Sequence, residues 1–353
     1  MLATGCIKNR IFLDVSVYLV IFVPFNTSCM RNEFKSLLKD TIKSAVGLYK
    51  IMIPISIIVK LLQYFGFIAI LGEVLAPVMK LVGLPGACGI VWATTMVTNI
   101  YGGMMTFYSL PVLSTLSTAQ VSVLCSLMLM AHALPIELQV ARKAGCRLAI
   151  MFLIRFGFGI VTGILMFQLL QLTGLLQEQN VVQWQPETIE NPTLLAWLSG
   201  ELKKYIIVFF VVMALLFVMR ILKKSGALDW FSEALKPVLG IMGINKEVIP
   251  MTVIGLSLGI LYGGALIIKE TEEKNIPKTD IFYSFVLMGL CHSLIEDSLL
   301  MISMGAHWSM IFIFRMLFAL TVTYLLVKVT KLFASKHIER IAMIKKQKTS
   351  KEL

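Results

Sequence analysis

Four stretches of the chain are apolar over about 20 residues, the length a helix needs to cross the hydrocarbon core of a bilayer. They are residues 45–65, 148–172, 205–221 and 308–327. Four further apolar runs are shorter or are interrupted by glycine and polar residues, namely 86–108, 119–134, 248–268 and 281–293. The composition agrees, since 58% of the 353 residues are hydrophobic and 15% are charged. The sequence therefore predicts an all-α polytopic membrane protein that lies in the lipid bilayer.

The net charge of +12 comes mainly from basic residues in short segments between apolar runs and in the C-terminal tail. This distribution is typical of loops on the cytoplasmic side of a membrane, so a nucleic-acid partner is not expected. The six cysteines form no CxxC pair, and the sequence contains no HExxH, GxSxG or GxxxxGK[ST] motif. We therefore expect no enzyme, no metal site, no cofactor and no nucleotide-driven transport.

The chain is predicted to be a duplication, because its two halves match when one is shifted by 160 residues. The segment GFIAILGEVLAPVMKLVG then lies over GALDWFSEALKPVLGIMG, with the glutamates, prolines and final glycines paired. The predicted repeats cover residues 45–172 and 205–327. A polar connector, 173–204, separates them, and a basic tail, 328–353, follows.

Residues 1–44 precede the first repeat. Residues 10–25 are apolar but short for a span, so they are either a signal-like segment, an extra anchor or sequence upstream of the true start. Met30 opens a stretch that reads like an amphipathic helix leading into the first span.

The loops suggest that the two repeats are inserted with opposite orientation. The loop before the last span of the first repeat contains Arg142, Lys143 and Arg147, whereas the equivalent loop, MISMGAHW, has no lysine or arginine. Positively charged loops stay in the cytoplasm, so equivalent loops are predicted on opposite sides. The connector is then extracytoplasmic and the basic tail cytoplasmic.

Inverted repeats need an odd number of crossings each, so residues 66–116 must return to the side that they left. A short amphipathic helix followed by a re-entrant hairpin would do this. The turn is expected at Asn99, Tyr101, Gly102 and Gly103, with Tyr262, Gly263 and Gly264 as the second-repeat counterparts. The alternative is that these small residues only allow helices to pack closely.

Three pairs of ionisable residues occupy equivalent positions in the two repeats: His132 with His292, Glu137 with Asp297, and Arg155 with Arg315. Ionisable groups are costly inside a membrane, so their repetition predicts a shared role. We expect them to converge near the midplane as a solute or ion pathway.

Glu296 is expected one helical turn from His292 on the same face, which would make His292, Glu296 and Asp297 a proton-coupled element. Arg155 and Arg315 would bind an anionic group or neutralise the carboxylates. The alternative is structural: each arginine pairs with the carboxylate of its own repeat and fixes helix packing, and the histidines are hydrogen-bonded core residues.

Several motifs resemble the Gate-domain, or nucleoside-recognition, membrane proteins, which include the spore maturation proteins A and B. They are GEVLAPVMKLVGLPG, NIYGG, MAHALPIE and HSLIEDSLLMISMGAHWSMIFIFR. The resemblance spans residues 45–327 and implies two Gate repeats in a multi-pass protein of a bacterial inner membrane.

Two functions are consistent with these features. One is secondary, ion- or proton-coupled transport of a small polar or anionic solute, such as a nucleoside or a related compound. The other is a non-transporting scaffold that acts with a partner in envelope or spore maturation. Whether the chain forms a homo-oligomer or binds a membrane partner protein stays open.

Overall fold

The computed structural model describes residues 27–110, 115–180, 194–273, 276–332 and 341–344. The predicted signal-like segment, much of the connector and most of the tail lie outside these ranges. The first half contains α1 (Thr27–Tyr64), α2 (Phe67–Leu81), α3 (Ala87–Val97), α4 (Ile100–Ser109), α5 (Thr118–Met130), α6 (Leu134–Lys143) and α7 (Leu148–Thr173). The second half contains α8 (Leu194–Lys224), α9 (Ala227–Ile241), α10 (Ile249–Leu258), α11 (Ile260–Glu273), α12 (Lys278–Cys291), α13 (Glu296–Ser303), the π-helix η2 (Ser309–Phe314) and α14 (Arg315–Leu332).

The two halves have their helices in the same order. For example, α9 begins and ends 160 residues after α2. Both helices follow a glycine in the left-handed region, Gly66 and Gly226, each with a φ of 74°. This φ favours glycine because it has no Cβ. The duplication read from the sequence therefore corresponds to a repeated succession of structural elements.

The prediction of an all-α polytopic membrane protein is confirmed. Within the described residues, five helical segments are long and apolar enough to cross a membrane, or six if the bent helix α1 is one span. Three of the predicted spans lie in α7, in α8 and in η2 with α14, and the fourth lies in α1. The runs 119–134 and 281–293 belong to longer segments than predicted, Thr118–Lys143 and Lys278–Ser303. Among the described residues no β-strand occurs.

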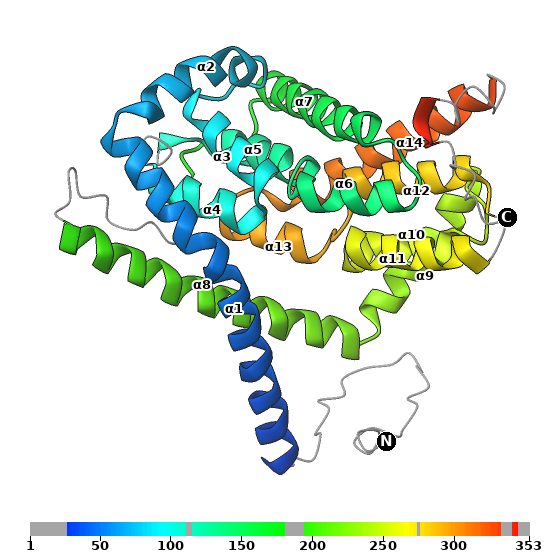
Figure 1. Cartoon of the computed structure of the whole chain (residues 1–353), viewed down its shortest axis with the longest axis horizontal. Helices are drawn as coiled ribbons and strands as arrows, with labels where there is room; N and C mark the ends of the chain where they lie inside the picture. The colour runs from blue at the N-terminus through cyan, green and yellow to red at the C-terminus, as the bar shows by residue number, and fades with distance from the viewer. Residues whose placement is uncertain (1–26, 111–114, 181–193, 274–275, 333–340, 345–353) are drawn as a thin grey trace, which may run out of the picture.

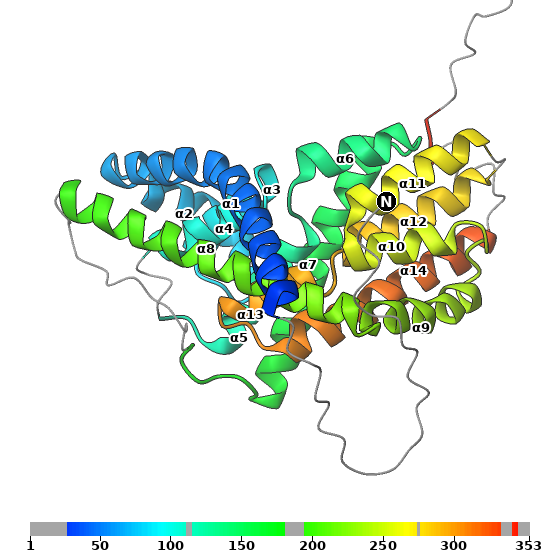
Figure 2. The ribbon, with the colours of Figure 1, turned by 90° about the horizontal axis from the view of Figure 1, so that it is seen from below.

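The segments α5–α6 and α12–α13 form the centre of the molecule. Their most apolar windows are 78% and 72% buried, compared with 17–28% for α7, α8 and the last span. Helices α2 to α4 lie at one end of the molecule and α9 to α11 at the other, with the central segments between them (Figures 1 and 2). Polar groups on the central segments are therefore shielded from lipid by the outer helices.

The predicted hairpins are pairs of short helices that fold back on themselves. Helix α3 turns into α4 at Thr98–Asn99, and α10 turns into α11 at Gly259, whose φ is 110°. A Cβ on Gly263 would lie 2.5 Å from Gly255 Cα, so the two helices of the second hairpin touch through their backbones. The turn predicted at Tyr262, Gly263 and Gly264 was therefore wrong, because these residues lie within α11. For Gly263 the alternative read from the sequence, close packing of helices, holds instead.

A candidate site between the two repeats

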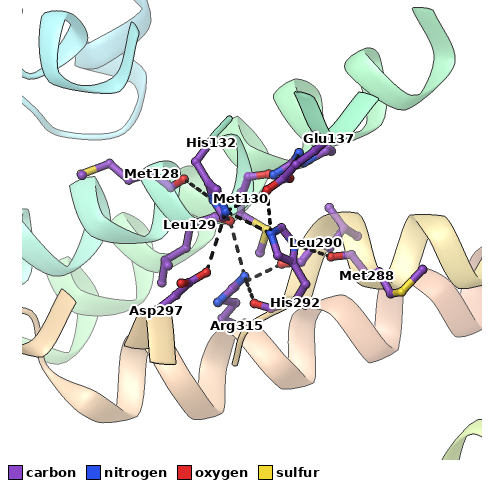
Figure 3. Close-up of polar contacts among 11 residues, drawn as sticks. Met128, Leu129, Met130, His132, Glu137, Met288, Leu290, His292, Asp297 and Arg315 are labelled. Atoms are coloured by element: carbon purple, nitrogen blue, oxygen red, sulfur yellow. Dashed lines mark hydrogen bonds and ion pairs between the residues drawn. The ribbon is translucent and has the colours of Figure 1, made fainter. Parts of the chain in front are cut away.

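Each central segment is broken at a histidine. Helix α5 ends at Met130 and α6 begins at Leu134, while α12 ends at Cys291 and α13 begins at Glu296. Each break contains a non-glycine residue in the left-handed region, Ala133 with a φ of 46° and Ser293 with a φ of 45°. Such residues are strained, and strain of this kind occurs at functional sites. The breaks direct both histidine side chains into the space between the repeats (Figure 3).

His132 and His292 face each other at the centre of the site (Figure 3). Their Nε2 atoms are 3.0 Å apart, and Glu137 Oε1 lies 3.3 Å from His132 Nε2 and 3.1 Å from His292 Nε2. Asp297 Oδ2 lies 3.8 Å from His132 Nε2. All four residues are buried. We call His132, His292, Glu137 and Asp297 the buried centre.

Backbone carbonyls determine which nitrogen of each imidazole carries hydrogen. His132 Nδ1 lies 3.3 Å from the carbonyl of Met128 and 3.2 Å from that of Leu129, and His292 Nδ1 lies 2.7 Å from that of Met288. A carbonyl oxygen only accepts, so both Nδ1 atoms donate. In the neutral rings both Nε2 atoms are then acceptors. The buried centre thus consists of two nitrogen and two carboxylate acceptors that point at one another.

Arg155 and Arg315 hold the ends of the broken helices. Arg155 Nε donates to the carbonyl of Met130 at 3.0 Å, and Arg315 Nε donates to that of Leu290, 160 residues later, at 3.1 Å. Arg315 also donates to the carbonyl of His292 at 3.0 Å. These carbonyls lack partners within their own helices, so the guanidinium groups act as caps.

The two arginines differ in their ion pairs. Arg155 Nη1 forms a short ion pair with Glu137 Oε2, as the structural interpretation predicts. No ion pair joins Arg315 to Asp297 among the described residues, so that half of the prediction was wrong. Six residues of π-helix precede Arg315, where the equivalent part of α7 is α-helical. A π-turn contains an extra residue, which changes the direction of the side chains that follow.

Glu296 does not stand beside His292 on one helical face, contrary to the prediction. Helix α12 ends before His292 and α13 begins at Glu296, so a sharp turn separates the two. Glu296 is the first residue of α13 and is partly buried.

The remaining predicted site residues lie in the hairpins, beside the buried centre. The Asn99 side chain accepts a hydrogen bond from Gly102 N, and Gly103 packs against Thr95. Gly263 packs against α10, and Gly264 packs against Val140 and Phe285. Tyr262 belongs to α11, but its side chain lies outside what the structure describes. Tyr101 lines a cavity that is discussed below.

Sequence reasoning missed the backbone acceptors at the helix ends, Met128, Leu129, Met130, Met288 and Leu290. Carbonyl groups leave no signal in residue type. The available signal was Pro135, which marks the start of α6 and so implies a preceding helix end beside His132.

The fold and the site define the class of this protein. It is an all-α membrane protein whose two halves have their helices in the same order, with a buried polar centre between them. Residues 45–176, which include the whole first repeat, match the Gate family, described as nucleoside recognition. The resemblance noted in the motifs is thereby confirmed, while a second Gate domain stays a prediction.

The chain is also 28% identical over 283 residues to the uncharacterized membrane protein YvoD of Bacillus subtilis (strain 168). The match covers 78% of this chain and 88% of that relative, so it extends into both repeats. No solved structure matches.

Proposed function

We propose that this protein is a secondary transporter of a bacterial inner membrane that moves a small polar solute together with an ion. The observation that carries the proposal is that both repeats contribute buried ionisable groups to one point between them. Secondary transporters place their sites at the interface of such repeats. A purely structural core would be less costly if it were apolar.

A cavity at the opposite end of α13 from the buried centre is the proposed solute site. Its volume is about 210 Å³, and it lies between α1, α4 and α8. The cavity is lined by Met52, Tyr101, Met104, Met105, Tyr108, Ile207, Val208, Val211 and Ser303. An apolar wall with a few hydroxyl groups suits a small solute that has a flat ring and polar substituents. The family description, nucleoside recognition, supports a nucleoside-like compound.

Helix α13 connects the cavity with the buried centre. Asp297 lies in the first turn of this helix, at the centre, and Ser303 is its last residue, at the wall of the cavity. A change of occupancy at the centre that moves α13 would therefore alter the solute site. Such a link is what coupling of ion and solute requires.

Uptake of labelled nucleosides and organic anions into proteoliposomes tests the proposal, under pH, Na⁺ and divalent-cation gradients. We expect gradient-dependent uptake, and we expect Asp297→Asn and His292→Gln to reduce it about tenfold or more. Glu233→Gln, on the exposed side of α9, is the matched control and should leave uptake unchanged. Uptake that ignores every gradient and both centre variants would refute the proposal.

The alternative is a non-transporting scaffold, and the capping role of the arginines favours it. Arg155 and Arg315 satisfy helix-end carbonyls, which is a structural task. Accessibility distinguishes the two functions. Ile136→Cys and Ser303→Cys, each in a cysteine-free background, should react with a membrane-impermeant thiol reagent if an aqueous pathway exists. Failure of both to react from either side would favour the scaffold.

A further inference from the structure

We infer that the buried centre binds a divalent transition-metal ion of the zinc class, through His132, His292, Asp297 and Glu137. Binding itself rests on the geometry alone; the role of this ion in coupling rests on the proposed function.

The first reason is the excess of acceptors. Both Nδ1 atoms donate to carbonyls, so the two Nε2 atoms that face each other at 3.0 Å are acceptors in the neutral rings. Glu137 Oε1 adds a third acceptor within 3.3 Å of both. Asp297 Oδ2 is buried and receives no hydrogen bond from the described residues. Acceptors arranged in this way repel one another unless a cation lies among them.

The second reason is the spacing of these atoms. In a tetrahedral zinc site with bonds of about 2.0–2.1 Å, neighbouring ligand atoms are about 3.3 Å apart. The two Nε2 atoms and Glu137 Oε1 are separated by 3.0, 3.1 and 3.3 Å. The Asp297 oxygen lies 3.8 Å from His132 Nε2, and His132, His292 and Asp297 offer ligand atoms that all lie within 4.8 Å of one another. Small side-chain rotations would bring the ligand atoms of His132, His292 and Asp297 to a common ion, with Glu137 Oε1 beside the two imidazoles.

The third reason is the support behind the ligands. In metal sites, a histidine that ligates through one nitrogen donates its other N–H to a carboxylate or backbone carbonyl. His132 and His292 both do this, with carbonyls at equivalent positions of the two repeats. Glu137 is held in turn by Arg155. The ligands therefore already have the orientation that a metal would require.

The positive charges of Arg155 and Arg315 do not make the surroundings of the buried centre positive overall. In their ionised forms Arg155 and Arg315 offset Glu137 and Asp297. The C-terminal ends of α5 and α12 also meet here, and each helix end carries about half a negative charge. The two arginines and the two carboxylates therefore cancel, and the helix ends leave the surroundings slightly negative. Both arginines donate to carbonyls at these helix ends. The Nε2 lone pairs stay directed at the centre.

The ligand types select the metal. Two imidazole nitrogens with carboxylate oxygens suit Zn²⁺, Co²⁺, Fe²⁺ or Mn²⁺, whereas Mg²⁺ and Ca²⁺ take oxygen ligands. The sequence contains no metal-ligand spacing because the two histidines are 160 residues apart. Only the fold brings them together.

The test uses the full chain in detergent, purified with a tag that contains no histidine. After treatment with EDTA, the protein is loaded with Zn²⁺ or Co²⁺ and desalted. We expect about one Zn²⁺ per chain by elemental analysis and the visible absorption bands of tetrahedral Co²⁺. His132→Gln with His292→Gln should lose both signals, and Asp297→Asn should weaken Zn²⁺ binding at least tenfold.

His307→Gln is the matched control, because His307 is paired with Ser309 outside the centre. It should bind Zn²⁺ like the unmodified chain. Glutamine keeps much of the size and polarity of histidine, and elution as a monodisperse species verifies that each variant is folded. If folded protein binds no Zn²⁺ or Co²⁺, or if the double variant binds as much as the control, a shared proton rather than a metal occupies the centre. Metal binding without uptake would overturn the proposed function alone, and uptake without metal binding would overturn this inference alone.

Discussion

At the scale of single residues, Ala133 and Ser293 hold the two imidazoles in place. Both follow a histidine directly and both have a φ near 45°. A residue with a side chain loses about 1–2 kcal/mol in the left-handed region, a cost that glycine avoids. The neighbouring structure must therefore impose this conformation, and it does so through hydrogen bonds from Ala133 N to Thr95 O and from Leu294 N to Leu256 O.

Ala133→Gly and Ser293→Gly are expected to stabilise the protein, each by about 1 kcal/mol, because they relieve backbone strain. Unfolding by SDS in mixed micelles would measure this. Ala141→Gly, in the regular part of α6, should have the opposite sign because glycine disfavours a helix. Equal destabilisation by all three substitutions would show that the backbone at Ala133 and Ser293 is not strained.

Arg155→Met is expected to destabilise the protein by about 3–5 kcal/mol, because it leaves Glu137 buried without its cation. Glu137→Gln in the same chain should recover part of this loss. Lys236→Met breaks an ion pair of similar type on the exposed face of α9 and should change the stability little. A small effect of Arg155→Met would mean that water or another cation reaches Glu137.

The residues that form the buried centre were largely predictable from the sequence. The repetition of His132, Glu137 and Arg155 at 160-residue spacing pointed to the residues that meet in the structure. The roles of Glu296 and Arg315 were not predictable. They depend on a helix break and on a π-helix, which change side-chain directions without an unusual residue composition.

At the scale of elements, the second hairpin depends on two glycines. A Cβ on Gly263 would lie 2.5 Å from Gly255 Cα and 2.8 Å from the carbonyl oxygen of Met251, so it meets backbone that cannot rotate away. Gly157 lies in α7 with no atom near its Cβ position. The close approach of α10 and α11 therefore requires glycine at position 263, whereas no contact among the described residues requires it at position 157.

Gly263→Ala is expected to lower the stability by about 1–3 kcal/mol, because α10 and α11 must separate. Gly157→Ala should raise the stability or leave it unchanged, since alanine favours a helix. Thermal unfolding of both variants in detergent would show the contrast. Equal behaviour of the two would contradict the close approach of these helices.

The first hairpin turn was predictable because Asn99 leaves a local signal, whereas the second turn lies at Gly259, before the residues predicted for it. The long central segments were not predictable. Polar residues and Pro135 interrupt their hydropathy, so the sequence indicated short runs where the structure has segments of 26 residues. Burial by the outer helices allows these polar residues, and burial is a tertiary property.

At the scale of the whole molecule, α7 has different loops at its two ends. The basic loop of the first repeat lies at its start, and a loop of the second repeat lies beyond its end. Next to its start, Arg147 N donates to Ala342 O and Ile344 N donates to Gly145 O, so the tail contacts the basic loop. Beyond its end, Asn180 contacts Met304 and Gly305. Gly145 and Gly305 are equivalent positions with φ values of 98° and 96°, yet they lie near opposite ends of α7. Inverted repeats require equivalent loops to lie at opposite ends in this way, and the inversion itself stays a prediction.

Sidedness can be measured with single cysteines in a cysteine-free chain. Lys143→Cys is expected to react with an impermeant reagent only from the cytoplasm, and Glu178→Cys only from the outside. Lys224→Cys should behave like Lys143→Cys, because the equivalent ends of α1 and α8 would then lie on opposite sides. Labelling of Lys143→Cys and Glu178→Cys from the same side would disprove the inversion.

The contact between the tail and the start of α7 also allows conformational change to be measured by hydrogen exchange. Any rocking of one repeat against the other must either carry residues 341–344 along with α7 or break the two backbone hydrogen bonds at Arg147 and Ile344. In the first case these amides exchange with deuterium slowly, whatever the protein has bound. In the second case their exchange becomes faster whenever one repeat moves against the other, so these two amide protons would report how often that movement occurs.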